Sequence, residues 1–116
     1  MKLLLYHGTP QDNIPSIFKN GFNISSNNWG KTYGNGVYLT GDLQTAKIYS
    51  EGGPVITCEV EIYKPFYAQN RKKYKWWKHY DSYISADLEE IVVKNPQVVI
   101  PLKISGKIEK YTLSFY

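Results

Sequence analysis

Residues 55–62 constrain the fold most strongly, because apolar and polar side chains alternate along this segment without interruption. Ile56, Cys58, Val60 and Ile62 occupy every second position, and Thr57, Glu59 and Glu61 lie between them. A period of two places neighbouring side chains on opposite faces of a strand. The segment therefore predicts a strand with one buried face and one face toward water.

Five other segments have the composition of strands, at residues 2–6, 36–40, 90–93, 98–104 and 107–115. In the first of them, Leu3, Leu4 and Leu5 form an apolar run that we expect to be buried on both faces. Lys64-Pro65 ends the alternating strand, and residues 66–86 follow it with no steady period.

Two short helices complete the expected fold. The first follows Pro10, is capped by Asp12 or Asn13, and ends at residues 20–21; its buried stripe is Ile14, Ile17 and Phe18. The second begins at Asp42 and ends at Ser50. About six strands with two short helices predict an α+β fold built on a mainly antiparallel sheet.

Length and composition set further limits. A chain of 116 residues has room for one hydrophobic core, so we expect a single domain over residues 1–116. Cys58 is the only cysteine and cannot form an internal disulfide. No stretch approaches the roughly 18 apolar residues of a membrane helix, and the apolar run at residues 3–6 is too short for a signal peptide. We therefore expect a cytoplasmic protein without membrane contact.

The residue types present argue against several common catalytic sites. Two histidines and one cysteine do not supply the ligand set of a zinc site, so no metal is expected. No Gly-x-Ser-x-Gly elbow surrounds a serine, and no Walker-type phosphate loop is present.

Three polar residues associated with predicted strands remain as candidates for chemistry. His7 follows the first strand, Tyr38 lies in the second after a Gly-rich stretch at residues 33–36, and Glu90 begins the fourth. The Gly-rich stretch suits a hairpin turn as well as it suits close approach to a ligand. Each side chain also has an ordinary structural alternative: a hydrogen-bonding histidine, a core tyrosine and a charge at a strand edge.

Four motifs occur in a characteristic order and spacing. They are His7-Gly8-Thr9, then Gly34-Asn35-Gly36-Val37-Tyr38, then Tyr49 eleven residues later, and finally Glu90-Ile91-Val92-Val93. Together they resemble the ADP-ribosyltransferase family, and most closely its His-Tyr-Glu branch, which includes poly(ADP-ribose) polymerases and diphtheria-type toxins. The resemblance implies a small split-sheet fold and NAD as co-substrate.

The resemblance also implies which residues bind the nicotinamide half of NAD. His7 would bond a ribose hydroxyl, and the Gly8 backbone would bind the nicotinamide carboxamide. Tyr38 and Tyr49 would stack on the two faces of the nicotinamide ring. Where many polymerase-type members have a serine, this chain has Ala46, so one hydrogen bond to the carboxamide is expected to be missing.

Other matched residues concern the second ribose and catalysis. Thr9 and Asn13 would lie near the adenosine-side ribose. Glu90 would bond the 2′-hydroxyl of the nicotinamide ribose and, with His7 and Tyr38, form the catalytic set. Strand alternation is expected to turn the neighbouring carboxylate, Glu89, to the opposite face.

Residues 71–80 combine positive charge with aromatic rings just before the predicted catalytic glutamate. Five basic residues lie here, and without them the formal charge of +4 would become −1, from nine basic and ten acidic residues. Members of the family often place an acceptor loop in this region, which implies acceptor binding by Arg71, Lys72, Lys73, Lys75, Trp76 and Trp77. Cations and flat rings suit single-stranded nucleic acid, RNA above all. The alternatives are a protein acceptor with an acidic face, and tryptophans that are simply buried.

Three functions follow from these patterns. The first is an NAD-dependent mono-ADP-ribosyltransferase that modifies RNA or DNA in preference to protein, as a toxin or phage-defence effector with an antitoxin partner. The absence of a helical regulatory domain before the matched segment favours single transfer over chain elongation. The second is an NAD glycohydrolase. The third is a nucleic-acid-binding module whose NAD site no longer turns over.

Overall fold

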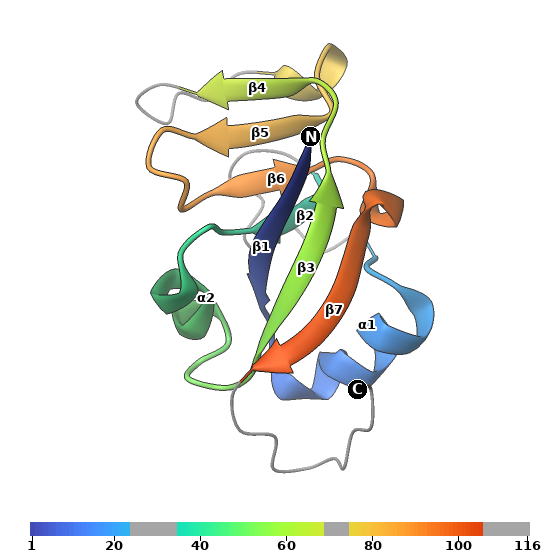
Figure 1. Cartoon of the computed structure of the whole chain (residues 1–116), viewed down its shortest axis with the longest axis vertical. Helices are drawn as coiled ribbons and strands as arrows, with labels where there is room; N and C mark the ends of the chain where they lie inside the picture. The colour runs from blue at the N-terminus through green and yellow to red at the C-terminus, as the bar shows by residue number, and fades with distance from the viewer. Residues whose placement is uncertain (24–34, 69–74, 106–116) are drawn as a thin grey trace.

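The computed structural model describes residues 1–23, 35–68 and 75–105, and seven strands with two short α-helices lie within these ranges (Figure 1). In chain order the elements are β1 (Lys2–Gly8), η1 (Gln11–Asn13), α1 (Ile14–Asn20), β2 (Val37–Leu39), α2 (Leu43–Tyr49), β3 (Val55–Glu61), β4 (Pro65–Ala68), η2 (Trp76–Lys78), β5 (Ser82–Ser85), β6 (Ile91–Val93), η3 (Pro96–Val98) and β7 (Val99–Ser105), where η denotes a 3₁₀ helix. The predicted α+β class is confirmed.

The strands form two sheets that run nearly crosswise to each other in Figure 1. One sheet has the order β1-β3-β7 and is antiparallel, and the other has the order β2-β6-β5-β4, in which β4 and β5 are parallel. A bridge between Tyr6 and Thr40 joins β1 to the end of β2 through two backbone hydrogen bonds of 2.8 and 2.9 Å. Residues that are far apart in the sequence therefore meet at this seam.

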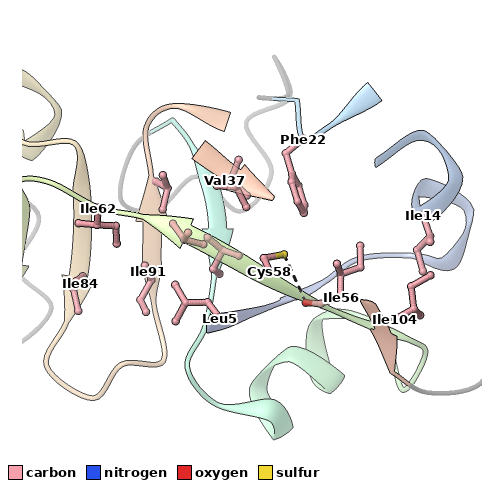
Figure 2. Packing of buried hydrophobic residues seen from close by; sticks show 14 residues of the cluster. Leu5, Ile14, Phe22, Val37, Ile56, Cys58, Ile62, Ile84, Ile91 and Ile104 are labelled. Carbon is pink, nitrogen blue, oxygen red and sulfur yellow. Dashed lines mark hydrogen bonds between the residues drawn. The ribbon is translucent and has the colours of Figure 1, made fainter. Parts of the chain in front are cut away.

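Strand β3 is the centre of the first sheet and of the main core. Its predicted inward residues, together with Ile62, are buried and contact side chains from both helical and strand segments (Figure 2). The alternation of residues 55–62 is therefore confirmed on the apolar face. The opposite face is less exposed to solvent than expected, because Thr57 is buried as well.

Strand β1 corrects one expectation about burial. Leu5 is buried and Leu3 packs against the main core, but Leu4 is 66% exposed. The apolar run was predicted to be covered on both faces, and this was wrong. β1 lies at the edge of an antiparallel sheet with one covered face, so alternation decides which leucines are buried.

Strands β4 and β5 add to the predicted fold, because no strand was predicted within residues 66–86. β4 begins at Pro65, which fits a proline at the first residue of an edge strand. All four residues of β5 are buried. A strand that is covered on both faces shows no alternation of polar and apolar residues, so its sequence has no period-two signal.

The two helices begin and end close to the predicted positions. Asp42 caps α2, because its carboxylate accepts hydrogen bonds from Thr45 N at 3.1 Å and Thr45 Oγ1 at 2.7 Å. Gly21 ends α1 with a φ of +80°, as a C-cap glycine does. Of the two predicted caps of α1, Asn13 occupies the N-cap position, but its side chain makes no capping hydrogen bond.

The buried side chains form two clusters on opposite faces of the second sheet. Within β2, Val37 and Leu39 belong to the main core, and Tyr38 packs against the other cluster. We call this other group the aromatic cluster; it consists of Ala68, Trp76, Tyr83 and Val92 with Tyr38, Phe66 and Tyr80 packed against them. No helix within the described ranges has the length and apolar character needed to cross a membrane.

Several predicted features lie outside the described residues. They are the strand at residues 107–115, Gly34 of the Gly-rich stretch, and the basic residues Arg71, Lys72 and Lys73.

Candidate active site

His7 and Tyr38 meet where β1 passes the end of β2. The His7 Nδ1 atom lies 2.8 Å from the Tyr38 carbonyl oxygen. A carbonyl oxygen only accepts, so Nδ1 carries the proton and Nε2 of the neutral ring is left as an acceptor. The ring also packs edge-on against Phe22 at 4.8 Å between centroids. This geometry leaves Nε2 as the atom able to accept a bond from a hydroxyl group.

The protein around His7 favours the neutral imidazole. Burial lowers the pKa of His7 below its ordinary value, and the hydrogen bond to the Tyr38 carbonyl opposes this shift only in part. The side chain is partly rather than fully covered. His7 is therefore suited to accepting a hydrogen bond near neutral pH rather than to carrying a positive charge.

Gly8 brings β1 into direct contact with α2. A Cβ atom at this position would come within 2.9 Å of Tyr49 Cβ and 3.0 Å of the Ala46 carbonyl carbon. Real Cβ atoms do not approach backbone this closely, so this position requires glycine. Ala46 itself is fully buried at the same contact.

Gly36, the described glycine of the Gly-rich stretch, lies against a neighbouring strand. A Cβ there would meet Val93 O at 2.6 Å and Val92 Cγ1 at 2.8 Å. The close approach of this glycine is therefore to strand β6. This contact fixes β2 beside β6 and so fixes the position of Tyr38.

Tyr49 and Glu90 form the most direct contact between two predicted site residues. The Tyr49 hydroxyl donates a hydrogen bond of 2.7 Å to Glu90 Oε1. Tyr49 is the last residue of α2, and Glu90 immediately precedes β6. The Tyr49 side chain is 47% exposed, so much of its ring remains accessible to a ligand.

Thr9 and Asn13 are also adjacent, one turn of chain beyond Gly8. The Asn13 side-chain amide donates a hydrogen bond of 3.0 Å to Thr9 Oγ1, and Thr9 is buried. The pair lies on the segment that follows His7 and Gly8, so its position is set by the end of β1.

The predicted acceptor residues do not share one environment. Trp76 is 0% exposed and packs in the aromatic cluster, so its ring offers no face to a base. Its assignment to acceptor binding is therefore corrected. Trp77 is 39% exposed and Lys75 is exposed, whereas Arg71, Lys72 and Lys73 lie outside the described residues.

The exposed part of this segment lies at the end of the sheet opposite Glu90. The Trp77 carbonyl accepts a 3.0 Å hydrogen bond from Lys94 Nζ, and Lys94 directly follows β6. Glu90 precedes β6, beside the end of β5 at Ser85. The four residues of β5 span about 10 Å between its two ends at roughly 3.3 Å per residue. Trp77 therefore contacts the residue that follows β6, whereas Glu90 precedes this strand.

Two residues that sequence analysis did not select also touch Glu90 or its neighbour. Ser85 Oγ accepts a 3.0 Å hydrogen bond from Glu90 N, and Asp87 Oδ1 accepts one of 3.0 Å from Glu89 N. The Ser-x-Asp pattern before Glu90 is a turn signal that could have drawn attention to them.

The described residues contain neither a thiolate nucleophile nor a metal cluster. Burial raises the pKa of Cys58 to about 12, so its thiol stays protonated. No group of three or more metal-ligating side chains lies together in the described ranges.

Comparison with known proteins agrees with the geometry. A model of the poly(ADP-ribose) polymerase catalytic domain family matches residues 1–114. No curated protein matches the chain. The family match covers both sheets and all the residues that meet at the site, and it confirms the resemblance inferred from the order of the motifs.

Proposed function

The chain belongs to the poly(ADP-ribose) polymerase catalytic domain family. We propose that it is an NAD-dependent ADP-ribosyltransferase that transfers single ADP-ribose units to a nucleic acid. The family as a whole consists of NAD-dependent ADP-ribosyltransferases. Beyond this general activity, we propose that the enzyme attaches one ADP-ribose unit rather than elongating a chain of them, and that its acceptor is RNA or DNA rather than protein.

The proposal that this chain binds NAD as the ADP-ribose donor rests on one observation. Gly8, Tyr49 and Glu90 are neighbours through the β1–α2 contact and the 2.7 Å Tyr49–Glu90 hydrogen bond, and His7 directly precedes Gly8. These are the residues to which the family resemblance assigns the nicotinamide half of NAD. Their meeting supports one NAD site at the seam between the two sheets.

Glu90 is suited to the bond-breaking step. The bond between nicotinamide and ribose breaks with its electron pair leaving on nicotinamide, and the ribose develops oxocarbenium character. A carboxylate held near the ribose stabilises this positive charge, and His7 Nε2 can accept a bond from a ribose hydroxyl. The acceptor oxygen or nitrogen then bonds to the anomeric carbon and gives its proton to water.

Charge and geometry favour a nucleic-acid acceptor. Lys75 and Lys78 are exposed and flank Trp77 in the sequence, and the exposed Lys94 donates a hydrogen bond to the Trp77 carbonyl. The Trp77 side chain itself is partly exposed. Lysines offset phosphate charge, and a tryptophan face can stack a base for about 1–3 kcal/mol. Because Trp77 contacts Lys94, which follows β6, whereas Glu90 precedes that strand, we propose that this surface holds nucleotides flanking the modified one.

Substitution of the glutamate tests the donor half. We expect Glu90→Gln to fold normally and to lose roughly a hundredfold in the rate of nicotinamide release, since one preorganised charge contact contributes on the order of 3 kcal/mol. Glu89→Gln, which alters the neighbouring carboxylate, is the matched control and should remain active. Turnover near wild type in Glu90→Gln would refute the assignment.

Labelled NAD incubated separately with RNA, DNA and a cell lysate tests the acceptor half. Labelled RNA or DNA supports the proposal, and label confined to protein bands refutes it. Nicotinamide release without any transfer would instead identify an NAD glycohydrolase. Salt-sensitive RNA binding without turnover would identify a binding module.

The cellular role is the least direct part of the proposal and rests on the family resemblance. We propose a cytoplasmic toxin or phage-defence effector with an antitoxin partner. Growth arrest after induced expression of the wild type, with no arrest by Glu90→Gln, tests this role.

A further inference from the structure

The last residue of β5 is a buried serine, and its hydroxyl group makes hydrogen bonds to two residues of the turn that leads to β6. Ser85 is 1% exposed, and its Oγ donates a 2.6 Å hydrogen bond to Asp87 Oδ1. The same Oγ accepts a 3.0 Å hydrogen bond from Glu90 N. The hydroxyl proton is committed to the carboxylate, so an oxygen lone pair faces the Glu90 amide.

Backbone bonds close this turn around the same serine. Ser85 N donates to Glu90 O at 2.9 Å, and Leu88 N donates to Ser85 O at 3.1 Å. Asp87 Oδ1 also accepts from Glu89 N at 3.0 Å. Ser85 and Asp87 therefore hold the two residues at which the chain enters β6.

The turn is also tied to the helix that carries Tyr49. The Leu88 carbonyl accepts a 2.9 Å hydrogen bond from Gly41 N, just before α2. At the far end of α2, the Tyr49 hydroxyl donates to Glu90 Oε1 at 2.7 Å. The backbone of Glu90 is thus held through Ser85, and its carboxylate is held through Tyr49.

We propose that Ser85 and Asp87 are a positioning pair that sets the direction of the Glu90 carboxylate. The inference rests on the proposed function, in which that carboxylate stabilises the ribose cation. Neither residue touches NAD in this scheme. They act by fixing the Glu90 amide, because a carboxylate that two methylene groups join to a mobile backbone could not keep one orientation toward the ribose.

The variants Ser85→Ala and Ser82→Ala form a matched pair. Ser82 is a fully buried serine on the same strand, and its Oγ donates a 3.0 Å hydrogen bond to Asp81 Oδ1. Ser82 lies at the far end of β5 from Glu90. Both substitutions remove a buried hydroxyl next to an aspartate, but only Ser85→Ala frees the Glu90 amide.

The kinetic constants of these variants distinguish a positioning role of Ser85 from a general loss of structure. We expect Ser85→Ala to lower kcat about tenfold with KM for NAD unchanged, as for a lost interaction of about one hydrogen bond. Ser82→Ala should keep the wild-type kcat. Asp87→Ala should lower kcat, and Asp87→Asn should restore it, because the amide oxygen still accepts both hydrogen bonds. A kcat of Ser85→Ala within twofold of wild type would overturn the proposal.

A double variant tests whether Ser85 acts through Glu90. In a Glu90→Gln background, adding Ser85→Ala should cause no further tenfold loss, because the carboxylate to be positioned is already absent. A further loss of the same factor would show that Ser85 acts elsewhere and would overturn the proposal.

An NMR measurement, which does not depend on catalysis, tests the positioning role separately from the proposed enzymatic function. The NMR signal of the Glu90 side-chain carboxyl carbon should shift or broaden in Ser85→Ala and stay unchanged in Ser82→Ala. If it is unchanged in both, the positioning role is wrong whatever the reaction. If it changes in Ser85→Ala but Glu90→Gln is fully active, the positioning stands and the catalytic assignment fails.

Discussion

The Tyr49 hydroxyl donates a hydrogen bond of 2.7 Å to Glu90 Oε1 across 41 residues of sequence. The family resemblance gives these two side chains separate tasks, one stacking on nicotinamide and the other bonding a ribose hydroxyl. A phenol hydroxyl lies in the plane of its ring, so one tyrosine can offer its face to nicotinamide and its hydroxyl to the carboxylate. We therefore regard Tyr49 as a link between donor binding and catalysis.

Tyr49→Phe separates these two tasks. The ring face is retained, so KM for NAD should change little, whereas kcat should fall roughly fivefold because a hydrogen bond of about 1 kcal/mol at this partly exposed position is lost. Steady-state nicotinamide release measures both constants. Tyr63→Phe removes a hydroxyl from a strongly exposed tyrosine and should leave both unchanged. A rise in KM with constant kcat would contradict the assignment.

Gly8→Ala tests the contact between β1 and α2. The added methyl group would press on Tyr49 Cβ and on the Ala46 carbonyl group. Overpacking of this kind typically costs about 1–3 kcal/mol, so the urea midpoint should fall, and NAD binding should weaken as Tyr49 moves. Gly41→Ala is the control for stability, because its Cβ would meet Leu88 only at ordinary distances of 3.4 and 3.5 Å. Equal urea midpoints for the two variants would refute this packing argument.

The lowered pKa of His7 predicts that the folded protein loses stability as the pH falls. The His7 pKa is lowered in the folded protein, so between that value and the ordinary value of 6.5 the unfolded chain binds more protons. The free energy of unfolding should therefore fall as pH drops below about 6.5, by at most about 1.4 kcal/mol per pH unit. Above that range, His7 is neutral in both states and makes no difference.

Comparison with His7→Asn isolates this effect from the titration of carboxylates. The asparagine amide can still donate to the Tyr38 carbonyl but does not titrate. Urea unfolding followed by tryptophan fluorescence at pH 7.5 and 5.5 should show a smaller loss of stability in the variant. An identical loss in both proteins would show that His7 is not the titrating group.

The sequence was informative wherever one local pattern decides the structure. The alternation of β3, the Asp42 cap of α2 and the terminal glycine of α1 follow from neighbouring residues alone. The order of the motifs was sufficient to identify the family and to predict that Tyr49 and Glu90 belong to one site. Their direct hydrogen bond could not be predicted, because it depends on where α2 ends relative to β6.

The features that the sequence did not predict are those that depend on tertiary contacts. Leu4 lies within an apolar run yet faces outward, because β1 is covered on one face only. Strand β5 has no alternation, because both of its faces are buried. Ser85 resembles any turn serine in the sequence, and only the folded turn shows that its hydroxyl meets the Glu90 amide.

Trp76→Ala and Trp77→Ala should have opposite consequences, although the two residues are adjacent. Trp76 fills the aromatic cluster, so its loss should cost about 3–5 kcal/mol of unfolding free energy by leaving a cavity. Trp77→Ala should change stability little but weaken binding of a single-stranded RNA probe by about 1–3 kcal/mol, together with the salt dependence expected of Lys75 and Lys78. Urea unfolding and fluorescence anisotropy measure the two effects. Unchanged RNA affinity in Trp77→Ala would mean that the exposed ring contacts no base, leaving the neighbouring lysines as a general attraction for anions.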